Sequence, residues 1–251
     1  MHPGRPCGLR PPRRSRRPVD IPPADRPGPS RYRPVRDSPG HLLLPLRHLV
    51  DDVDALREHL DLPRMDLLGH STGTNIATQY AARHPANVSK LALIRPSLRA
   101  VDLVITEEMR RELAQLRENE PWFPAAFAAP QAITEGTGSD WEAVAPFFWA
   151  GGTPPHSSTM QPAGRATRKL SLFRGRGRFQ PKSTRAALAS LEAPVLLLTG
   201  EFDLNSPPVA AAGFAEAFPD ATLAVQRGAG HYPGLDDADR FVATTGTFLR
   251  G

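Results

Sequence analysis

Two uninterrupted apolar runs constrain the fold more than any other feature of this sequence. One spans residues 91–94 (LALI) and the other spans residues 195–198 (VLLL). A strand made only of apolar side chains must be buried on both faces, which is typical of parallel sheets covered by helices on each side. Residues 65–94 also show the order strand, tight turn, helix and strand, with the helical pattern ending before Pro85. The sequence therefore predicts an α/β fold built from parallel β-α-β units.

The flanking patterns predict the remaining elements. An amphipathic helix is expected over residues 48–60, with Asp51, Asp52 and Asp54 in its first turn, where the helix dipole favours acids. Further elements are a helix at 107–116, strands at 194–199 and 221–226, and a helix at 208–217. A last helix is expected to begin near Asp236, with an apolar face made of Leu235, Phe241, Val242 and Phe248.

Composition divides the chain into four segments. Residues 1–40 hold 11 of the 28 prolines and 10 arginines against 3 aspartates, so they carry too little apolar surface to offset the entropy of ordering. We predict a disordered arm over residues 1–45, core segments at 46–99 and 186–251, and an inserted, mainly helical cap at 100–185. All three tryptophans lie in this insertion. Its aromatic residues either line an apolar pocket or form a small core of their own: Trp122, Phe123, Phe127, Trp141, Phe147, Phe148 and Trp149.

Several protein classes are disfavoured by composition. Cys7 is the only cysteine, which excludes an intramolecular disulfide framework and a thiolate-rich zinc site. No run of 18 apolar residues predicts a membrane span, and no targeting signal is recognised, so we expect a cytoplasmic protein. Outside residues 1–40 the chain carries 21 basic and 23 acidic side chains, which argues against nucleic acid as the main partner. The sequence does not specify an oligomeric state.

The pentapeptide Gly69-His70-Ser71-Thr72-Gly73 lies between a predicted strand and a predicted helix. A serine on such a sharp turn takes a strained backbone, and flanking glycines allow neighbouring chains to approach it. Its hydroxyl then projects at a helix N-terminus, where backbone N–H groups can stabilise an oxyanion. The alternative is that Ser71 only caps the helix.

Two polar residues follow later strands of the same predicted sheet. Asp203 comes after strand 194–199, and His231 comes after strand 221–226. Because the carboxyl ends of parallel strands share one edge, both are expected near Ser71. Glu201 is a rival acid, Asp203 alone could start a turn, and His231 alone could be a loop histidine. His70 is interpreted as a packing residue, and the last helix is expected to be capped, with no metal bound, by Asp236, Asp237 and Asp239.

With the chain order serine, aspartate, histidine, residues 46–99 and 186–251 resemble the α/β-hydrolases, and residues 100–185 occupy the position of that family's cap. The resemblance implies hydrolysis of an ester or amide of a small or medium apolar substrate, with no cofactor and no metal. Ser71 would be the nucleophile, His231 its base and Asp203 the acid that orients His231. The Thr72 N–H would be one oxyanion donor. Aminopeptidases of this fold are a possible subgroup, although no motif selects them.

The chain departs from this family before residue 46. The family builds several strands before the helix at 48–60, whereas this chain offers about 47 residues there, rich in arginine and proline, with no His-Gly pair to supply a second oxyanion donor. We therefore expect an open edge on strand 65–68 and a partial hydrolase sheet, and we attribute residues 1–40 to a wrong start or shifted reading frame. Alternative functions are a catalytically impaired hydrolase-like protein and a binder of nucleic acid or an anionic surface through residues 1–40 and 165–185.

Overall fold

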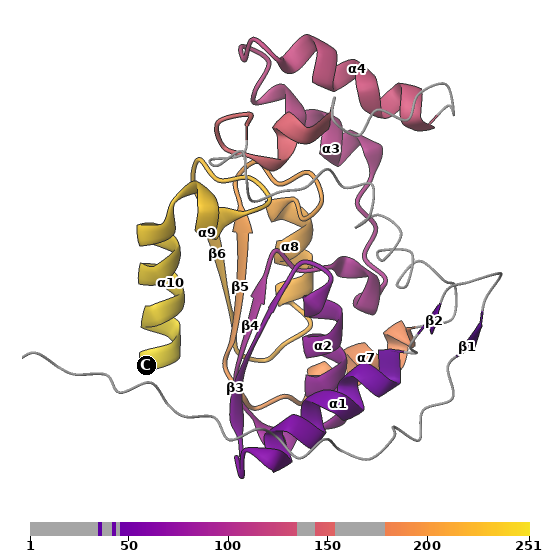
Figure 1. Cartoon of the computed structure of the whole chain (residues 1–251), viewed down its shortest axis with the longest axis vertical. Helices are drawn as coiled ribbons and strands as arrows, with labels where there is room; N and C mark the ends of the chain where they lie inside the picture. The colour runs from indigo at the N-terminus through magenta and orange to yellow at the C-terminus, as the bar shows by residue number, and fades with distance from the viewer. Residues whose placement is uncertain (1–34, 37–41, 44–45, 135–143, 154–178) are drawn as a thin grey trace, which may run out of the picture. The chain divides into compact units, whose positions relative to one another are not determined.

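The structure is a computed structural model that describes residues 35–36, 42–43, 46–134, 144–153 and 179–251 (Figure 1). The predicted arm over residues 1–45 lies outside these ranges, apart from a short antiparallel pair formed by β1 (Val35–Arg36) and β2 (Leu42–Leu43). Trp141 also lies outside the described residues, as do residues 165–178 of the segment 165–185 that the alternative binding function would use.

Four parallel strands form the central sheet of the described chain. They are β3 (Met65–His70), β4 (Val88–Ile94), β5 (Val195–Gly200) and β6 (Ala221–Gln226), in that spatial order. The bounds of β4 and β6 agree with the sequence prediction, and the parallel α/β arrangement is confirmed. Within the part of the chain that the structure describes, β3 pairs only with β4 and is an edge strand.

Helices connect and cover these strands. The α-helices are α1 (Leu46–His59), α2 (Gly73–Arg83), α3 (Glu107–Gln115), α4 (Phe123–Thr134), α7 (Pro181–Leu188), α8 (Pro208–Ala215), α9 (Pro233–Asp236) and α10 (Ala238–Arg250). Short 3₁₀ turns are η1 (Pro85–Asn87), η2 (Leu98–Val101) and η3 (Ala145–Phe148).

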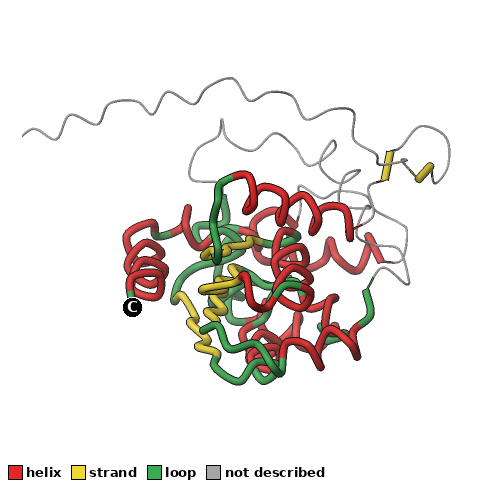
Figure 2. Tube along the Cα trace, turned by 90° about the horizontal axis from the view of Figure 1, so that it is seen from below, coloured by secondary structure: helices red, strands yellow, loops and turns green. Residues whose placement is uncertain are grey.

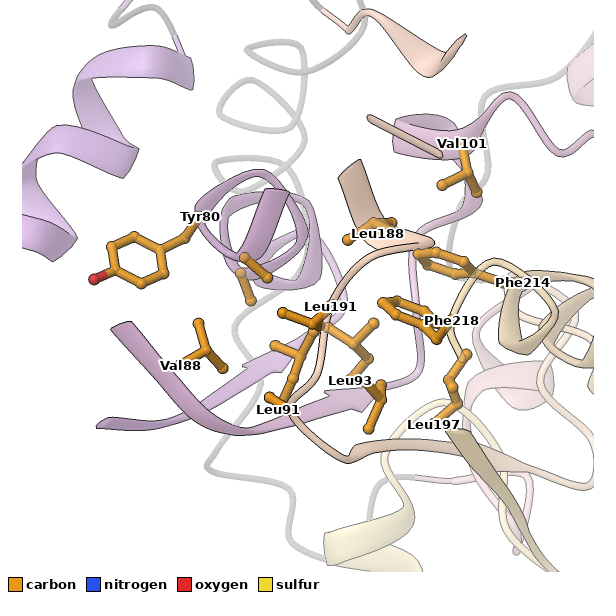
Figure 3. Packing of buried hydrophobic residues seen from close by; sticks show 14 of the residues in the cluster. Tyr80, Val88, Leu91, Leu93, Val101, Leu188, Leu191, Leu197, Phe214 and Phe218 are labelled. Carbon is orange, nitrogen blue, oxygen red and sulfur yellow. The ribbon is translucent and has the colours of Figure 1, made fainter. Parts of the chain in front are cut away.

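The two faces of the sheet pack against different helices. Leu91, Leu93 and Leu197 face a large core shared with α2, α7 and α8, whose members in Figure 3 include Tyr80 and Phe214. The alternate residues of β4 and β5 face the other side of the sheet: Ala92, Ile94, Leu196 and Leu198. On that side they pack against Phe241 and Phe248 of α10. Figure 2 shows α10 on one side of the strands and most of the other helices on the opposite side. Each fully buried leucine side chain stabilises the fold by about 1.5–3 kcal/mol.

A smaller apolar cluster joins α3, α4 and η3. Its buried members are Ala114, Ala126 and Phe147. Four partly buried side chains pack against them, three of them aromatic: Trp122, Phe123, Phe127 and Leu204. The buried guanidinium of Arg117 lies 4.5 Å from the centre of the Trp122 ring and donates hydrogen bonds to the carbonyl groups of Trp149 and Ala150. Trp122, Phe123, Phe127 and Phe147 therefore form a core, as one of the two interpretations proposed.

The predicted start of the first helix is wrong in detail, whereas the last helix begins close to Asp236, as predicted. Because α1 begins at Leu46, which is buried together with Val50, Asp51 and the following acids lie beyond the first turn. The last helical segment is two helices, since Asp237 adopts extended backbone and its side chain accepts the Arg240 N–H to cap α10. Leu235 and Val242, expected on the apolar face, are 53% and 62% exposed.

Asp236 does not cap α10. Its carboxylate accepts hydrogen bonds from the backbone N–H groups of Ala150 and Gly230, so it connects the segment after η3 to the loop that carries His231. Of the helices that the structure describes, none has the length and apolarity needed to cross a membrane.

Candidate active site

Ser71 occupies a strained turn between β3 and α2. Its φ angle is 56°, in the left-handed region, which costs a non-glycine residue about 1–2 kcal/mol. The turn is held by the Ser71 N–H, which donates to the Ile94 carbonyl at 3.0 Å, and by the Ser71 carbonyl, which accepts from Thr74. The N-cap position of α2 belongs to Thr72, and no side-chain hydrogen bond caps the helix. Ser71 is therefore not the capping residue that the alternative interpretation proposed.

The two glycines of the pentapeptide have different steric roles. A Cβ atom added to Gly69 would lie 2.9 Å from the backbone carbonyl carbon and oxygen of Gly73, closer than side chains tolerate. A Cβ atom added to Gly73 would meet nothing within 4 Å. The turn therefore requires glycine at position 69, where the start of α2 folds back against β3.

Asp203 and His231 form a buried pair on the loops after β5 and β6. The His231 Nδ1 atom lies 3.1 Å from Asp203 Oδ1, and the two residues are 5% and 1% exposed. The backbone N–H of Asn205 donates to the same oxygen at 2.9 Å. Because an ionised carboxylate only accepts hydrogen bonds, His231 carries its proton on Nδ1. Its Nε2 atom then has a lone pair with which it can act as a base.

The surroundings set the charge state of this pair. Burial alone would raise the pKa of Asp203, but the neighbouring His231 and the positive charge of Arg95 outweigh it and bring the pKa to about 2. Burial lowers the pKa of His231, and Arg95 and His70 lower it further against the opposing effect of Asp203. At neutral pH the site therefore holds a carboxylate beside a neutral imidazole, which is the state a general base needs.

Contacts with three other segments fix the loop that carries His231. The His231 N–H donates to the Phe148 carbonyl, and the Phe148 ring meets the His231 ring edge-on at 5.1 Å. A Cβ atom on Gly200 would overlap the carbonyl oxygen of Gly230, so β5 also packs closely against this loop. His70 lies with Nε2 3.2 Å from the His231 carbonyl oxygen, which brings the loop next to the turn that holds Ser71.

Arg95 is a residue of the site that the sequence analysis missed. It directly follows β4, and its guanidinium donates through Nη1 to Ser71 Oγ at 2.8 Å and through Nε to Asp203 Oδ2 at 3.2 Å. Its side chain is 12% exposed. Its one signal in the sequence is its position directly after a buried parallel strand, and that position alone does not distinguish a site residue from a charge that returns to solvent.

The structure brings the four predicted residues to one edge of the sheet. Asp203 contacts His231 directly, whereas Ser71 is linked to Asp203 through Arg95. Within the described residues, no hydrogen bond joins Ser71 to His231, and none takes up the Thr72 N–H. Glu201, the rival acid, instead accepts the Gly228 N–H at 2.7 Å. Any second oxyanion donor from before residue 46 lies outside the described ranges.

The chemistry available at this edge is that of a nucleophile and a base. Among the described residues, no group of three or more His, Cys, Asp or Glu side chains is arranged to hold a metal ion. His70 packs with its ring against Tyr232 at 5.6 Å, which agrees with a packing role. The arrangement thus places a serine hydroxyl, bound by Arg95, at the same sheet edge as a neutral imidazole that is oriented by a carboxylate.

Comparison with known proteins gives matches along most of the chain. The family model described as alpha/beta hydrolase fold matches residues 14–238, so the match begins well before the segment that the sequence analysis assigned to this family. A pimeloyl acyl-carrier-protein methyl ester esterase from Chromobacterium violaceum is 30% identical over 217 residues, which are 82% of this chain and 79% of that protein. A proline iminopeptidase from Clostridium botulinum is 24% identical and covers 80% of this chain and 71% of its own length.

The chain is also similar to a solved esterase structure. A thermophilic esterase from Thermogutta terrifontis is 25% identical, with a TM-score of 0.51, and the match covers 83% of this chain and 73% of that one. The parallel sheet, the strained serine turn after β3 and the extent of these matches lead to one conclusion: this chain belongs to the α/β-hydrolase-fold family.

Proposed function

We propose that this protein is a serine hydrolase that cleaves a carboxyl ester of a small or medium apolar acyl group through Ser71, His231 and Asp203. The observation that carries the proposal is the buried Asp203–His231 pair, which Arg95 links to a serine held in a left-handed turn. Strain at a non-glycine residue and a buried, charged acid with a base are features that cluster at catalytic sites.

In the first half of the reaction, Ser71 Oγ attacks the carbonyl carbon of the ester while its proton passes to His231 Nε2. Asp203 keeps the imidazole oriented and stabilises the imidazolium that forms. The carbonyl oxygen becomes an oxyanion, which the Thr72 N–H stabilises at the start of α2. When the tetrahedral intermediate collapses, His231 gives the proton to the departing alcohol, and the acyl group remains on Ser71.

In the second half, a water molecule replaces the alcohol. His231 takes a proton from the water as its oxygen attacks the acyl carbon, and then returns a proton to Ser71 Oγ as the acid product leaves. Every step is a proton transfer or an acyl transfer among Ser71, His231, the ester and the water molecule. The proposed reaction uses no metal or cofactor.

We propose an ester substrate, and not an amide, because two of the similar proteins are named as esterases. The relative at 30% identity is named for a methyl ester, and the solved structure at 25% identity is an esterase, whereas the iminopeptidase is more distant at 24%. Phe148, whose ring faces His231, supports an apolar acyl group at the reacting end. We further propose that residues 100–185 form the cap and that Phe148 is its contribution to the substrate site.

A fluorophosphonate probe tests this proposal, because it forms a covalent bond only with an activated serine. We expect the native protein to be labelled and Ser71→Ala to show no labelling. Ser190→Ala is the matched control, since Ser190 is exposed and lies beyond α7, away from the site. Native protein and S71A that are labelled equally would refute the proposal, and turnover of a p-nitrophenyl acyl ester against the matching anilide would separate ester from amide cleavage.

A further inference from the structure

Four consecutive strands each deliver one polar side chain to the same edge of the sheet. In spatial order, β3 is followed by Ser71, β4 by Arg95, β5 by Asp203 and β6 by His231. Side-chain hydrogen bonds follow this order without a gap, from Ser71 to Arg95, from Arg95 to Asp203 and from Asp203 to His231. Because β4 lies between the strands of the nucleophile and the acid, a long side chain at its carboxyl end can reach both.

We propose that Arg95 is a fourth functional residue of this site: its guanidinium holds Ser71 Oγ and Asp203 Oδ2 together and thereby directs the Ser71 proton toward His231. This inference rests on the proposed hydrolase function. It concerns a role that the serine, histidine and aspartate do not fill.

The direction of the hydrogen bond to Ser71 is unambiguous. A guanidinium has five N–H donors and no acceptor, so Arg95 Nη1 donates and Ser71 Oγ accepts at 2.8 Å. The hydroxyl hydrogen of Ser71 must therefore point elsewhere. The free Nε2 lone pair of His231 is the acceptor that the reaction requires, so the contact with Arg95 orients the hydroxyl for proton transfer.

The same guanidinium controls the acid. Asp203 divides its oxygens between two partners, with Oδ1 on His231 and Oδ2 on Arg95. A carboxylate held at both oxygens cannot rotate about its last bond, so the oxygen facing His231 keeps its position. The planar fork of arginine suits this double contact in a way that the single ammonium of lysine does not.

Stability gives no sufficient reason to keep this arginine. A buried ion pair often contributes little to the free energy of folding, because removing both charges from water is costly. Arg95 also has a φ angle of 51°, in the left-handed region, and directly precedes Pro96, which restricts its backbone further. Its N–H donates to the Leu198 carbonyl at 2.6 Å, which fixes this turn at the end of β4. A strained backbone that carries a buried charge is typical of a functional residue.

Arg95 also affects the pKa of His231 and the oxygen of Ser71 that loses its proton. The charged and titratable side chains that face His231 are those of Asp203 after β5, Arg95 after β4, His70 at the end of β3, and the adjacent Tyr232. Asp203 raises the pKa of His231, whereas Arg95 and His70 lower it. As the Oγ–carbon bond forms and the proton moves to His231, Arg95 keeps its own protons and already donates to the oxygen that loses one.

Three arginine variants of the full chain test the proposal. Arg95→Met removes the donors and the charge, Arg95→Lys keeps the charge without the fork, and Arg99→Met is the matched control at an exposed arginine four residues away. For each variant we would measure the second-order rate of fluorophosphonate labelling, the pKa of His231 by NMR with H231Q as the assignment reference, and folding by circular dichroism.

We expect R95M to be labelled about 10²-fold more slowly than the native protein, as for the loss of one positioned donor. Its His231 pKa should rise, because a positive charge nearby has gone. R95K should keep the His231 pKa close to native and still be labelled more slowly, which separates the bridging contact from the charge. R99M should match the native protein in all measurements.

Other outcomes overturn the inference and remain distinguishable from failure of the proposed function. R95M labelled at the native rate with an unchanged His231 pKa refutes a role for Arg95 while leaving the hydrolase intact. Where R95M does not fold, R95K labelled at the native rate refutes the bridging role. A native protein labelled no better than S71A refutes the hydrolase, and the role of Arg95 falls with it.

Discussion

Two carboxylates of this protein, one buried and one partly exposed, have the same lowered pKa and very different surroundings. Asp203, at the carboxyl edge of the sheet, and Asp54, in α1, both have a pKa of about 2 against an ordinary value of 3.8. The pKa of Asp54 is lowered first by a hydrogen bond from Arg57, against burial, and then by Tyr80. A lowered pKa by itself therefore does not mark the active site.

The partners of the two acids make the difference. Asp54 Oδ1 accepts from Arg57 at 2.9 Å, from Tyr80 at 2.8 Å and from Asn87 at 3.2 Å, none of which changes charge near neutral pH. These contacts tie α1 to α2 and η1. Asp203 instead contacts a histidine, and an arginine that holds a serine hydroxyl. The first network holds helices together, whereas the second leads to an atom that can react.

Backbone strain separates the same two regions. Among the residues that the structure describes, four non-glycine residues have positive φ: Asp61, Ser71, Arg95 and Asp102. The aspartates lie after α1 and at the end of η2, where this residue type adopts left-handed backbone several-fold more often than most. Serine and arginine lack that preference. Both strained residues without a local reason therefore lie at the edge of the sheet that carries the proposed site.

The largest effect is expected from Asp203→Asn. This change removes the negative charge that orients and stabilises His231 and leaves Arg95 without its counter-ion, so ester hydrolysis should fall about 10⁴-fold. Turnover of a p-nitrophenyl ester measures the change, with circular dichroism as a test of folding. Asp54→Asn is the matched control and should retain native turnover. Equal losses in the two variants would remove the distinction between the two carboxylates.

Asp54→Ala should affect stability and spare activity. The Tyr80 side chain is fully buried and would lose the acceptor of its hydroxyl group, which costs about 1–3 kcal/mol of unfolding free energy. Urea unfolding at neutral pH measures the loss, and probe labelling of the folded variant should proceed at the native rate. Asp52→Ala, at an exposed position of the same helix, should change neither.

The pH dependence of stability follows from the same shift. Because the pKa of Asp54 is lower in the folded protein than in the unfolded chain, its contribution is complete above about pH 4 and is lost as the pH falls toward 2. D54A should therefore lose less stability than the native protein over this range. A stability difference between D54A and native protein that stays constant from pH 5 to about pH 2 would contradict the assignment.

The sequence predicts the regular parts of this molecule better than its contacts. Residues 88–94 and 221–226 are found as strands because an apolar run or alternation in a parallel sheet has few other interpretations. The prediction that Ser71, Asp203 and His231 share an edge follows from the same topology. Asp237 caps the last helix as predicted, whereas the contacts of Asp236 with Ala150 and Gly230 could not be recognised because they exist only in the folded loop.

Arg95 was missed for a related reason. At the end of a buried strand, an arginine is usually interpreted as a charge that returns to solvent, and nothing next to it in sequence indicates otherwise. Its partners lie 24 and 108 positions away in the chain. Only the placement of β4 between β3 and β5 brings them within reach, and this order is a property of the folded sheet. The prediction of a shared edge was therefore correct, but its list of residues was incomplete.

The smallest effect is expected from Gly213→Ala in α8. An added Cβ atom there would meet only the Leu103 Cδ1 atom, at 3.9 Å, which is ordinary contact. Alanine restricts the unfolded chain more than glycine and favours a helix, so the variant should be more stable by about 0.5–1 kcal/mol in urea unfolding. At Gly200, by contrast, the same substitution would push a methyl group into the carbonyl of Gly230 and displace His231. A glycine is thus required where β5 approaches the histidine loop and dispensable in the helix that follows, and a destabilised G213A would show that α8 is as tightly constrained as that edge.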